Sequence, residues 1–151
     1  MKNFTFSSIL ILVLFLTGCG GNDDAPKPVN KATFRVELTQ EGDYLKFNRI
    51  ITISGDGSGF KYTGTNNSVP AVLMEDDLKP ASISMEGKDL GKLKIMIMTE
   101  FSALETGPAR VTLHFRVFKN NKLVEDVYFN YSETVKGKSE LLEYDYNTKT
   151  L

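Results

Sequence analysis

Residues 109–118, ARVTLHFRVF, alternate apolar and polar side chains as far as Val117. The apolar side chains of one face are Val111, Leu113, Phe115 and Val117. A period of two with one apolar face predicts a half-buried β-strand. Residues 119–122, KNNK, favour a tight hairpin because asparagine tolerates left-handed backbone geometry, and residues 123–134 alternate again as the partner strand.

The same alternation recurs along most of the chain, and no segment shows sustained helical periodicity. The further alternating segments are residues 31–40, 44–54, 58–65, 81–86, 92–101 and 140–146, and residues 69–73 fit a short edge strand. Roughly eight to nine short strands at this spacing are typical of an all-β sandwich. We therefore predict an antiparallel two-sheet sandwich of immunoglobulin-like or transthyretin-like type, with an up-and-down β-barrel as the alternative.

Three local patterns refine this fold. Gly55-Asp56-Gly57 is typical of a hairpin turn, which predicts an antiparallel meander of residues 31–40, 44–54 and 58–65. Residues 74–80 fit one helical turn that Pro80 ends. Residues 92–101 carry apolar side chains on both faces, which predicts a central strand or a strand covered on both sides.

Composition limits the class of protein. The chain has 151 residues, 41% of them hydrophobic, and 18 Lys and Arg against 19 Asp and Glu. A near-neutral balance argues against nucleic acid as a partner, because nucleic-acid binding needs a basic surface. Cys19 is the only cysteine, so it has no disulfide partner within the chain.

The first 18 residues predict a secretory signal. Lys2 gives a positive start, residues 9–16 form an unbroken apolar run, and small residues precede Cys19. A retained transmembrane anchor is the alternative, but the apolar segment is shorter than the roughly 20 residues that cross a bilayer.

Leu16-Thr17-Gly18-Cys19 resembles the lipobox of bacterial lipoproteins. The resemblance implies cleavage after residue 18 and attachment of a lipid to the Cys19 thiol. Gly20-Gly21-Asn22-Asp23-Asp24 follows, and this short acidic tail is similar to that of surface-exported lipoproteins of Bacteroidota-type bacteria. The resemblance implies an outer-membrane protein exposed at the cell surface, with a periplasm-facing position as the alternative. Residues 19–30 then form a flexible tether, and residues 31–151 form the sandwich domain.

Candidate sites are sparse in the domain. His114 is the only histidine and lies between arginines on a polar face, so we expect a surface residue. Residues 54–59, SGDGSG, resemble a calcium loop only in part, because an EF-hand would require a glutamate where Thr65 stands. Residues 75–77, EDD, are read as a solvated loop. The sequence thus predicts no metal site, no cofactor and no catalytic residue.

One aromatic group remains as a candidate binding face. Its members are Tyr128, Tyr131, Tyr144 and Tyr146. We expect a lipid-anchored, non-catalytic module of the cell envelope that recognises a protein or a glycan. The alternative is a structural subunit of an envelope or fimbrial assembly, joined by strand addition at a sheet edge formed by residues 69–73 or 140–146.

Overall fold

A computed structural model describes residues 31–135 and 137–145, so the predicted signal, Cys19 and the tether lie outside the described residues. The described part holds nine strands and two short 3-10 helices. In chain order these are β1 (Ala32–Gly42), η1 (Tyr44–Lys46), β2 (Phe47–Gly55), β3 (Phe60–Tyr62), β4 (Val72–Met74), η2 (Glu75–Leu78), β5 (Ser82–Leu90), β6 (Lys92–Phe101), β7 (Arg110–Lys119), β8 (Lys122–Ser132) and β9 (Lys138–Asp145).

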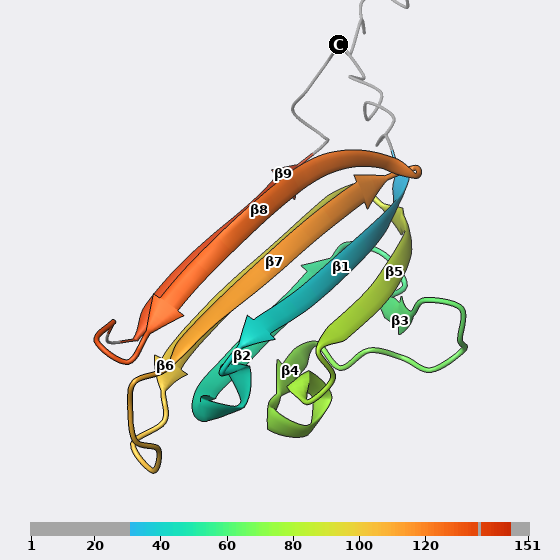
Figure 1. The fold of residues 1–151 in the computed structure, drawn as a ribbon. Coiled ribbons are helices and arrows are strands. Elements are labelled where there is room, and N and C mark those ends of the chain that lie inside the picture. Colours follow the sequence, from blue (N-terminus) through green and yellow to red (C-terminus); the bar gives the residue numbers. More distant parts are fainter. Residues whose placement is uncertain (1–30, 136, 146–151) are drawn as a thin grey trace, which may run out of the picture.

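The strands form two antiparallel sheets that face each other, as Figure 1 shows. The five-stranded sheet has the order β3-β5-β1-β7-β8, and the four-stranded sheet has the order β4-β2-β6-β9. The predicted two-sheet sandwich is confirmed, and the sheets do not close into the alternative barrel.

The predicted hairpin at residues 119–122 is present. Asn120 and Asn121 both have positive φ, 48° and 65°, and they join β7 to β8. Such a two-residue turn matches the twist of the strands that it connects. The single helical turn predicted before Pro80 is also present, as η2.

The predicted meander is wrong. β1 pairs with β5 and β7, whereas β2 belongs to the other sheet and pairs with β4 and β6. Residues 55–59 therefore carry the chain from one sheet to the other instead of closing a hairpin. Local turn chemistry cannot distinguish the two outcomes, because glycine and aspartate suit both kinds of connection.

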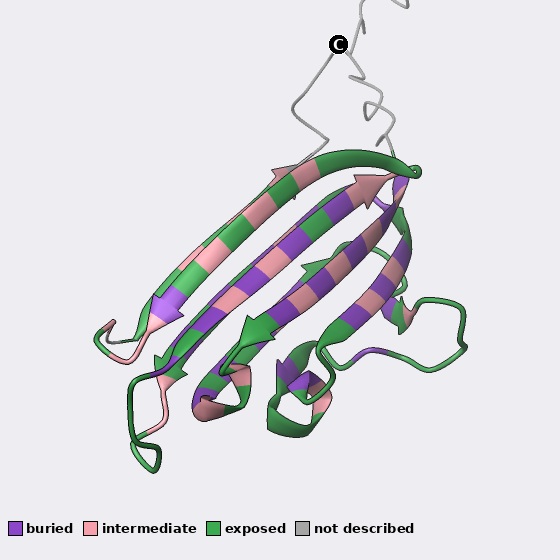
Figure 2. Cartoon of the chain, viewed as in Figure 1, coloured by how far each residue is buried: buried purple, intermediate pink, exposed green. Residues whose placement is uncertain are grey.

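The core lies between the sheets and follows the alternation of the strands. In Figure 2 buried and more exposed residues alternate along β1 and β7. The largest fully buried side chains come from both sheets and include Phe34, Phe115, Leu38, Ile51, Leu93, Ile95 and Ile97.

A buried hydrogen-bond network lies within this core. Arg49 faces inward from β2 and is only 5% exposed. Its Nη1 donates to the side-chain oxygen of Gln40 on β1 and to the carbonyl oxygen of Leu78 at 3.1 Å. Gln40 Nε2 donates to the carbonyl oxygens of Leu78 and Pro80 at 2.9 and 2.8 Å. The two sheets and the segment after η2 are thus tied by one buried network.

The outer side of the four-stranded sheet is unusually apolar. β6 lies between β2 and β9, which agrees with the predicted central strand, but Met96 and Met98 are exposed on its outer side. The strand is therefore covered on one side only. We name the exposed apolar side chains of this sheet the methionine face: Ile50, Val72, Met74, Met96, Met98 and Leu141.

Candidate functional site

Two places in the fold gather chemically useful groups. The first is an end of the sandwich where residues 55–59 pack against residues 88–92; we name it the loop end. Leu90 is fully buried beneath it. A Cβ on Gly57 would lie 2.5 Å from Leu90 Cδ2 and 2.8 Å from the carbonyl oxygen of Lys88. The loop can approach this closely only because the residue is glycine.

Asp56 fixes the two segments of the loop end to each other. Its Oδ1 accepts hydrogen bonds from the backbone N–H groups of Gly91 at 2.7 Å and Lys92 at 3.0 Å. The bond from Lys92 is the main reason that the pKa of the Asp56 carboxyl lies below its ordinary value, and Lys31 lowers it slightly further. Asp56 is therefore ionised in the folded protein at neutral pH.

Further oxygen atoms gather around Gly57. The carbonyl oxygens of Lys88 and Asp89 lie 2.8 and 3.1 Å from the position that its Cβ would take. Asp89 has a φ of 56° and is exposed at the same end. Carboxylate and carbonyl oxygens are the ligands that Ca²⁺ prefers. The donors of the loop end thus fit Ca²⁺ in kind.

The loop end is not a cage built from acidic side chains alone. Within residues 31–135 and 137–145, no group of three or more His, Cys, Asp or Glu side chains could hold a metal ion. Ca²⁺ takes six to eight oxygens and commonly uses backbone carbonyls for several of them. Ca²⁺ could be held by the carboxylates of Asp56 and Asp89 and by the backbone carbonyl oxygens of Lys88 and Asp89.

The second place is the outer side of the five-stranded sheet, which we name the polar face. Tyr128 is 58% exposed there, and its ring stacks on the ring of His114 with centroids 3.9 Å apart and 8° between the planes. His114 Nε2 lies 2.6 Å from Asp126 Oδ1. An exposed aromatic ring is thereby held in one orientation beside a carboxylate.

Paired polar groups extend the polar face on both sides of this cluster. The Thr112 hydroxyl donates to Asn130 Oδ1 at 2.7 Å. Glu37 forms ion pairs with Arg35 and with Arg116, the latter at 2.6 Å. Each of these pairs joins neighbouring positions on the sheet or lies along one strand, so the face carries fixed donors and acceptors around Tyr128.

The structure does not bring the predicted tyrosines onto one face. Tyr131 is 4% exposed and points between the sheets, where burial raises the pKa of its phenol to about 12. Tyr144 also faces inward, and its hydroxyl donates to Glu125 Oε2 at 2.6 Å. Tyr146 lies outside the described residues. Of the predicted tyrosines that the structure describes, only Tyr128 is an exposed aromatic platform.

The other candidates from the sequence analysis lie on the polar face, in η2 or outside the described residues. His114 lies on the polar face as expected, and its side chain is largely covered by Tyr128. Glu75 and Asp76 are exposed in η2, where Asp76 pairs with Lys79. Leu16, Thr17, Gly18, Cys19, Asp23 and Asp24 lie outside the described residues.

The sequence analysis did not identify most of the residues that form the loop end and the polar face. The partners of Tyr128 become visible only through the register that sets His114 opposite it and Asn130 opposite Thr112. The oxygens of the loop end include backbone carbonyls, which leave no trace in a sequence. A usable signal was the pair of glycines around Asp56, which indicated close backbone approach but was assigned to a hairpin.

Comparison with known proteins gives a consistent picture of the whole chain. The model of the family described as "PLAT/LH2 and C2-like Ca2+-binding lipoprotein" matches residues 2–145. No curated protein matches the chain.

Three solved structures share the fold. The calcium-bound form of a protein from Parabacteroides distasonis has a TM-score of 0.66 and 21% identity, over 83% of this chain and 100% of that one. A DUF4425 domain from Bacteroides vulgatus has a TM-score of 0.60 and 11% identity, over 76% and 94% of the two chains. A DUF4425 family protein from Bacteroides ovatus has a TM-score of 0.60 and 12% identity, over 80% and 99%.

Proposed function

The chain belongs to the PLAT/LH2 and C2-like Ca2+-binding lipoprotein family, and from this premise we propose that it is a lipid-anchored, non-catalytic module of the cell envelope that binds Ca²⁺ and recognises a glycan. The observation that carries the proposal is the loop end, where Asp56 joins two loops around a group of oxygen atoms. A protein is the second class of ligand that the sequence allows.

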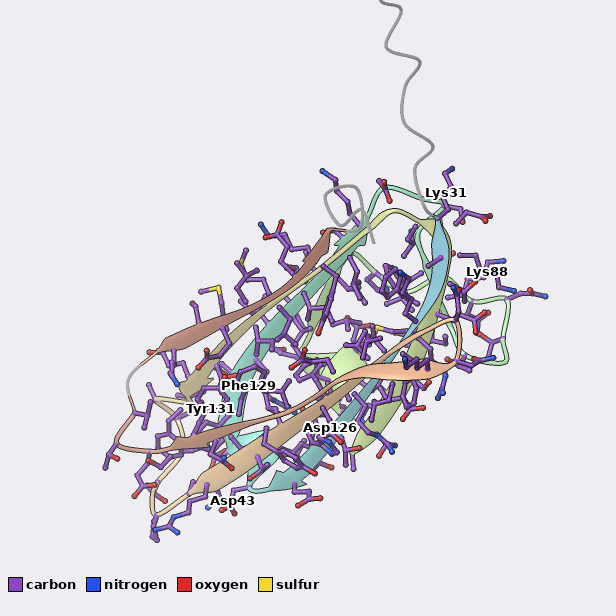
Figure 3. All side chains as sticks on the ribbon, turned by 90° about the horizontal axis from the view of Figure 1, so that it is seen from above. Lys31, Asp43, Lys88, Asp126, Phe129 and Tyr131 are labelled. Carbon is purple, nitrogen blue, oxygen red and sulfur yellow. The ribbon has the colours of Figure 1, made fainter. Side chains whose placement is uncertain are left out.

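The anchor is supported by the family. Membership in a lipoprotein family agrees with lipid attachment at Cys19 and with a position in the cell envelope. Within the described residues, no helix has the length and apolar character needed to span a bilayer. Lys31 follows the predicted tether and lies at the same end of the molecule as Lys88, far from Asp43, as Figure 3 shows.

Labelling tests the anchor, and accessibility tests its exposure. A palmitate analogue should label the wild type and leave Cys19→Ala unlabelled; equal labelling of both would remove the lipid assignment. Replacement of Asp23 and Asp24 by alanine should lower protease accessibility on intact cells if the protein stands on the outer surface. Unchanged accessibility would favour the periplasm-facing position.

Ca²⁺ at the loop end would neutralise the carboxylates of Asp56 and Asp89 and hold the two loops together. Binding to the native state alone stabilises it by mass action, by about 2.7 kcal/mol when the ligand is at 100 times its Kd. The wild type should therefore show a higher Tm in millimolar Ca²⁺ than in EDTA, and a smaller rise in Mg²⁺.

Asp56→Asn and Asp89→Asn are the informative variants. Asparagine keeps an oxygen that accepts the two N–H bonds at position 56, so folding is retained while a charged ligand is lost. Both variants should lose most of the Tm rise in Ca²⁺. Asp76→Asn, which changes an exposed carboxylate in η2, is the matched control. A full Ca²⁺ response in both loop variants would refute the loop end as the Ca²⁺ site.

The polar face is the best surface for recognition. An exposed ring can stack on the apolar side of a sugar, while flanking carboxylate, amide and guanidinium groups bond to its hydroxyls. Tyr128 supplies the ring, and Asp126, Asn130 and Arg116 supply the flanking groups. These contacts favour a pyranose-containing glycan over an apolar ligand.

Binding of the full-length lipoprotein to immobilised polysaccharides tests recognition. Tyr128→Ala should reduce retention at least about tenfold, which corresponds to about 1.4 kcal/mol. Leu45→Ala, which truncates a 65% exposed side chain in η1 outside both faces, should leave retention unchanged. Equal retention of wild type and Tyr128→Ala would exclude the polar face as the glycan site.

The structural-subunit alternative is also supported by one observation. β4 and β9 are the edge strands of the four-stranded sheet, as the sequence suggested for residues 69–73 and 140–146. Strand addition to β9 would extend this sheet through backbone hydrogen bonds. Electron microscopy of the native envelope fraction distinguishes the alternatives, because edge addition produces linear polymers.

A further inference from the structure

The methionine face is a continuous surface. Register places its side chains in two adjacent rows across the four-stranded sheet. One row is Met74, Ile50, Met98 and Ser139, and the next is Val72, Thr52, Met96 and Leu141. Every strand of the sheet contributes an exposed apolar side chain. A surface of this kind marks an interaction site.

Charged residues stand in the rows on either side of these two, and along β6 their signs differ. Along the outer side of β6 the chain reads Lys94, Met96, Met98, Glu100. Lys94 shares its row with Ser54 and Glu143, while Glu100 shares its row with Asn48. Lys94 forms a half-exposed pair with Glu143 at 3.6 Å, which leaves most of its donors available. The pattern is basic, apolar, apolar, acidic.

When two copies of this pattern run in opposite directions, basic residues face acidic residues and methionines face methionines. We propose that the methionine face packs against the methionine face of a second copy of this chain, around a two-fold axis that runs across the strands between the two apolar rows. β6 then crosses its counterpart in the opposite direction. Met96 faces Met98 of the second copy, and Lys94 faces Glu100 of the second copy, twice in each dimer. Such an isologous contact is the usual geometry of homodimers.

The packing geometry is that of two stacked sheets. Aligned sheets lie about 10 Å apart, at about 30° to each other, with interdigitated side chains. Methionine suits this contact because its flexible, polarisable side chain fills irregular gaps. An apolar row opposite an apolar row, with opposite charges at both ends, selects this register over one shifted by two residues, in which Lys94 would face a methionine.

The size of the face indicates a weak dimer that a membrane strengthens. The rows cover about 15 Å across the strands, and the stretch from Lys94 to Glu100 covers about 20 Å along them. This is less than the roughly 800 Å² per partner of stable complexes. Anchored copies share a thin layer above the membrane, which raises their effective concentration. Each tether of residues 19–30 spans up to about 40 Å, so both can reach one membrane from opposite ends of the dimer.

Cross-linking of the full-length lipoprotein in intact cells tests the contact. Two tagged copies are co-expressed, one with Met96→Cys and the other with Met98→Cys, and treated with a short bismaleimide. We expect a cross-link between the two tags that exceeds the cross-link of either variant with itself. Ser82→Cys with Ser84→Cys, at the same spacing on the outer side of β5, is the matched control.

Exchanging the charges of Lys94 and Glu100 tests whether the molecule that packs on the methionine face is a second copy of this chain. In the cross-linking pair, Lys94→Glu or Glu100→Lys should each reduce the cross-link about tenfold, because two attractive pairs become repulsive. The double variant Lys94→Glu/Glu100→Lys should restore it. Three results would each overturn the proposal. They are a cross-link that the charge variants do not change, a cross-link to another protein, and a cross-link no stronger than that of the control. Ca²⁺ binding at the loop end is independent of all three results.

Discussion

The two sheets bury their inner sides in the same way and differ on their outer sides. On the polar face, side chains on neighbouring strands satisfy one another, as in His114 with Asp126 and Glu37 with Arg116. On the methionine face, the outward side chains are apolar and exposed. The first face is stabilised within one chain. The second can gain stability only from another molecule, since apolar surface is stabilised by removal from water.

The largest effect should come from the group that holds the two sheets together. Arg49→Ala removes the donor to Gln40 and Leu78 and leaves their buried oxygens short of hydrogen bonds. Each such loss costs about 1–3 kcal/mol, so we expect a decrease of about 3 kcal/mol in the free energy of unfolding. Urea unfolding measures it. Arg49→Lys keeps the charge without the planar guanidinium, so its free energy of unfolding should lie between those of the wild type and Arg49→Ala. A loss below about 1 kcal/mol in Arg49→Ala would show that the network does not stabilise the fold.

The difference between the faces predicts a second, smaller effect. Glu37→Ala removes the carboxylate shared by Arg35 and Arg116 and leaves two guanidinium groups near each other. For a partly exposed network we expect a loss of about 1 kcal/mol, which high salt should reduce. Glu37→Gln, which keeps the shape, should recover part of it. An unchanged urea midpoint would mean that the pairs of the polar face contribute nothing measurable.

A matched change on the methionine face should behave differently. Met98→Gln replaces an exposed apolar side chain of similar length, and surface changes of this kind usually stay within about 0.5 kcal/mol. Stability should be nearly unchanged, while retention on a hydrophobic-interaction column should fall. A loss comparable to that of Glu37→Ala would show that Met98 packs within its own chain, and the contrast between the faces would fail.

Sequence alone predicted the strands because alternation is a local property. Residues 109–118 and 92–101 fall within β7 and β6 almost without shift. It predicted neither the sheet to which each strand belongs nor the crossing at residues 55–59. Pairing depends on contacts between distant segments, and several pairings satisfy the same apolar pattern.

The same limit applies to the sites. Apolar residues on both sides of β6 predicted a covered strand, because burial is the usual reason for such a pattern. The structure leaves Met96 and Met98 exposed, and the proposed contact with a second copy would account for the second apolar side. Tyr128 was identified from its type, but its stacking on His114 required the register of β7 and β8.

The smallest effect concerns acid, which should act on two carboxyls at the ends of the sandwich. The N–H of Lys92 lowers the pKa of Asp56 below its usual 3.8, and the N–H of Ala109 lowers the pKa of Glu133 below its usual 4.5. A carboxyl with a lower pKa in the folded state stabilises that state fully above its unfolded pKa. The contribution disappears as the pH falls through the folded pKa.

The double variant Asp56→Asn/Glu133→Gln isolates this contribution. Both replacements keep an oxygen that accepts the backbone N–H but remove the titration. Between about pH 5 and pH 3 its Tm should fall less steeply than that of the wild type, since fewer stabilising carboxylates become protonated. Parallel Tm curves for the two proteins would place the acid-sensitive groups elsewhere.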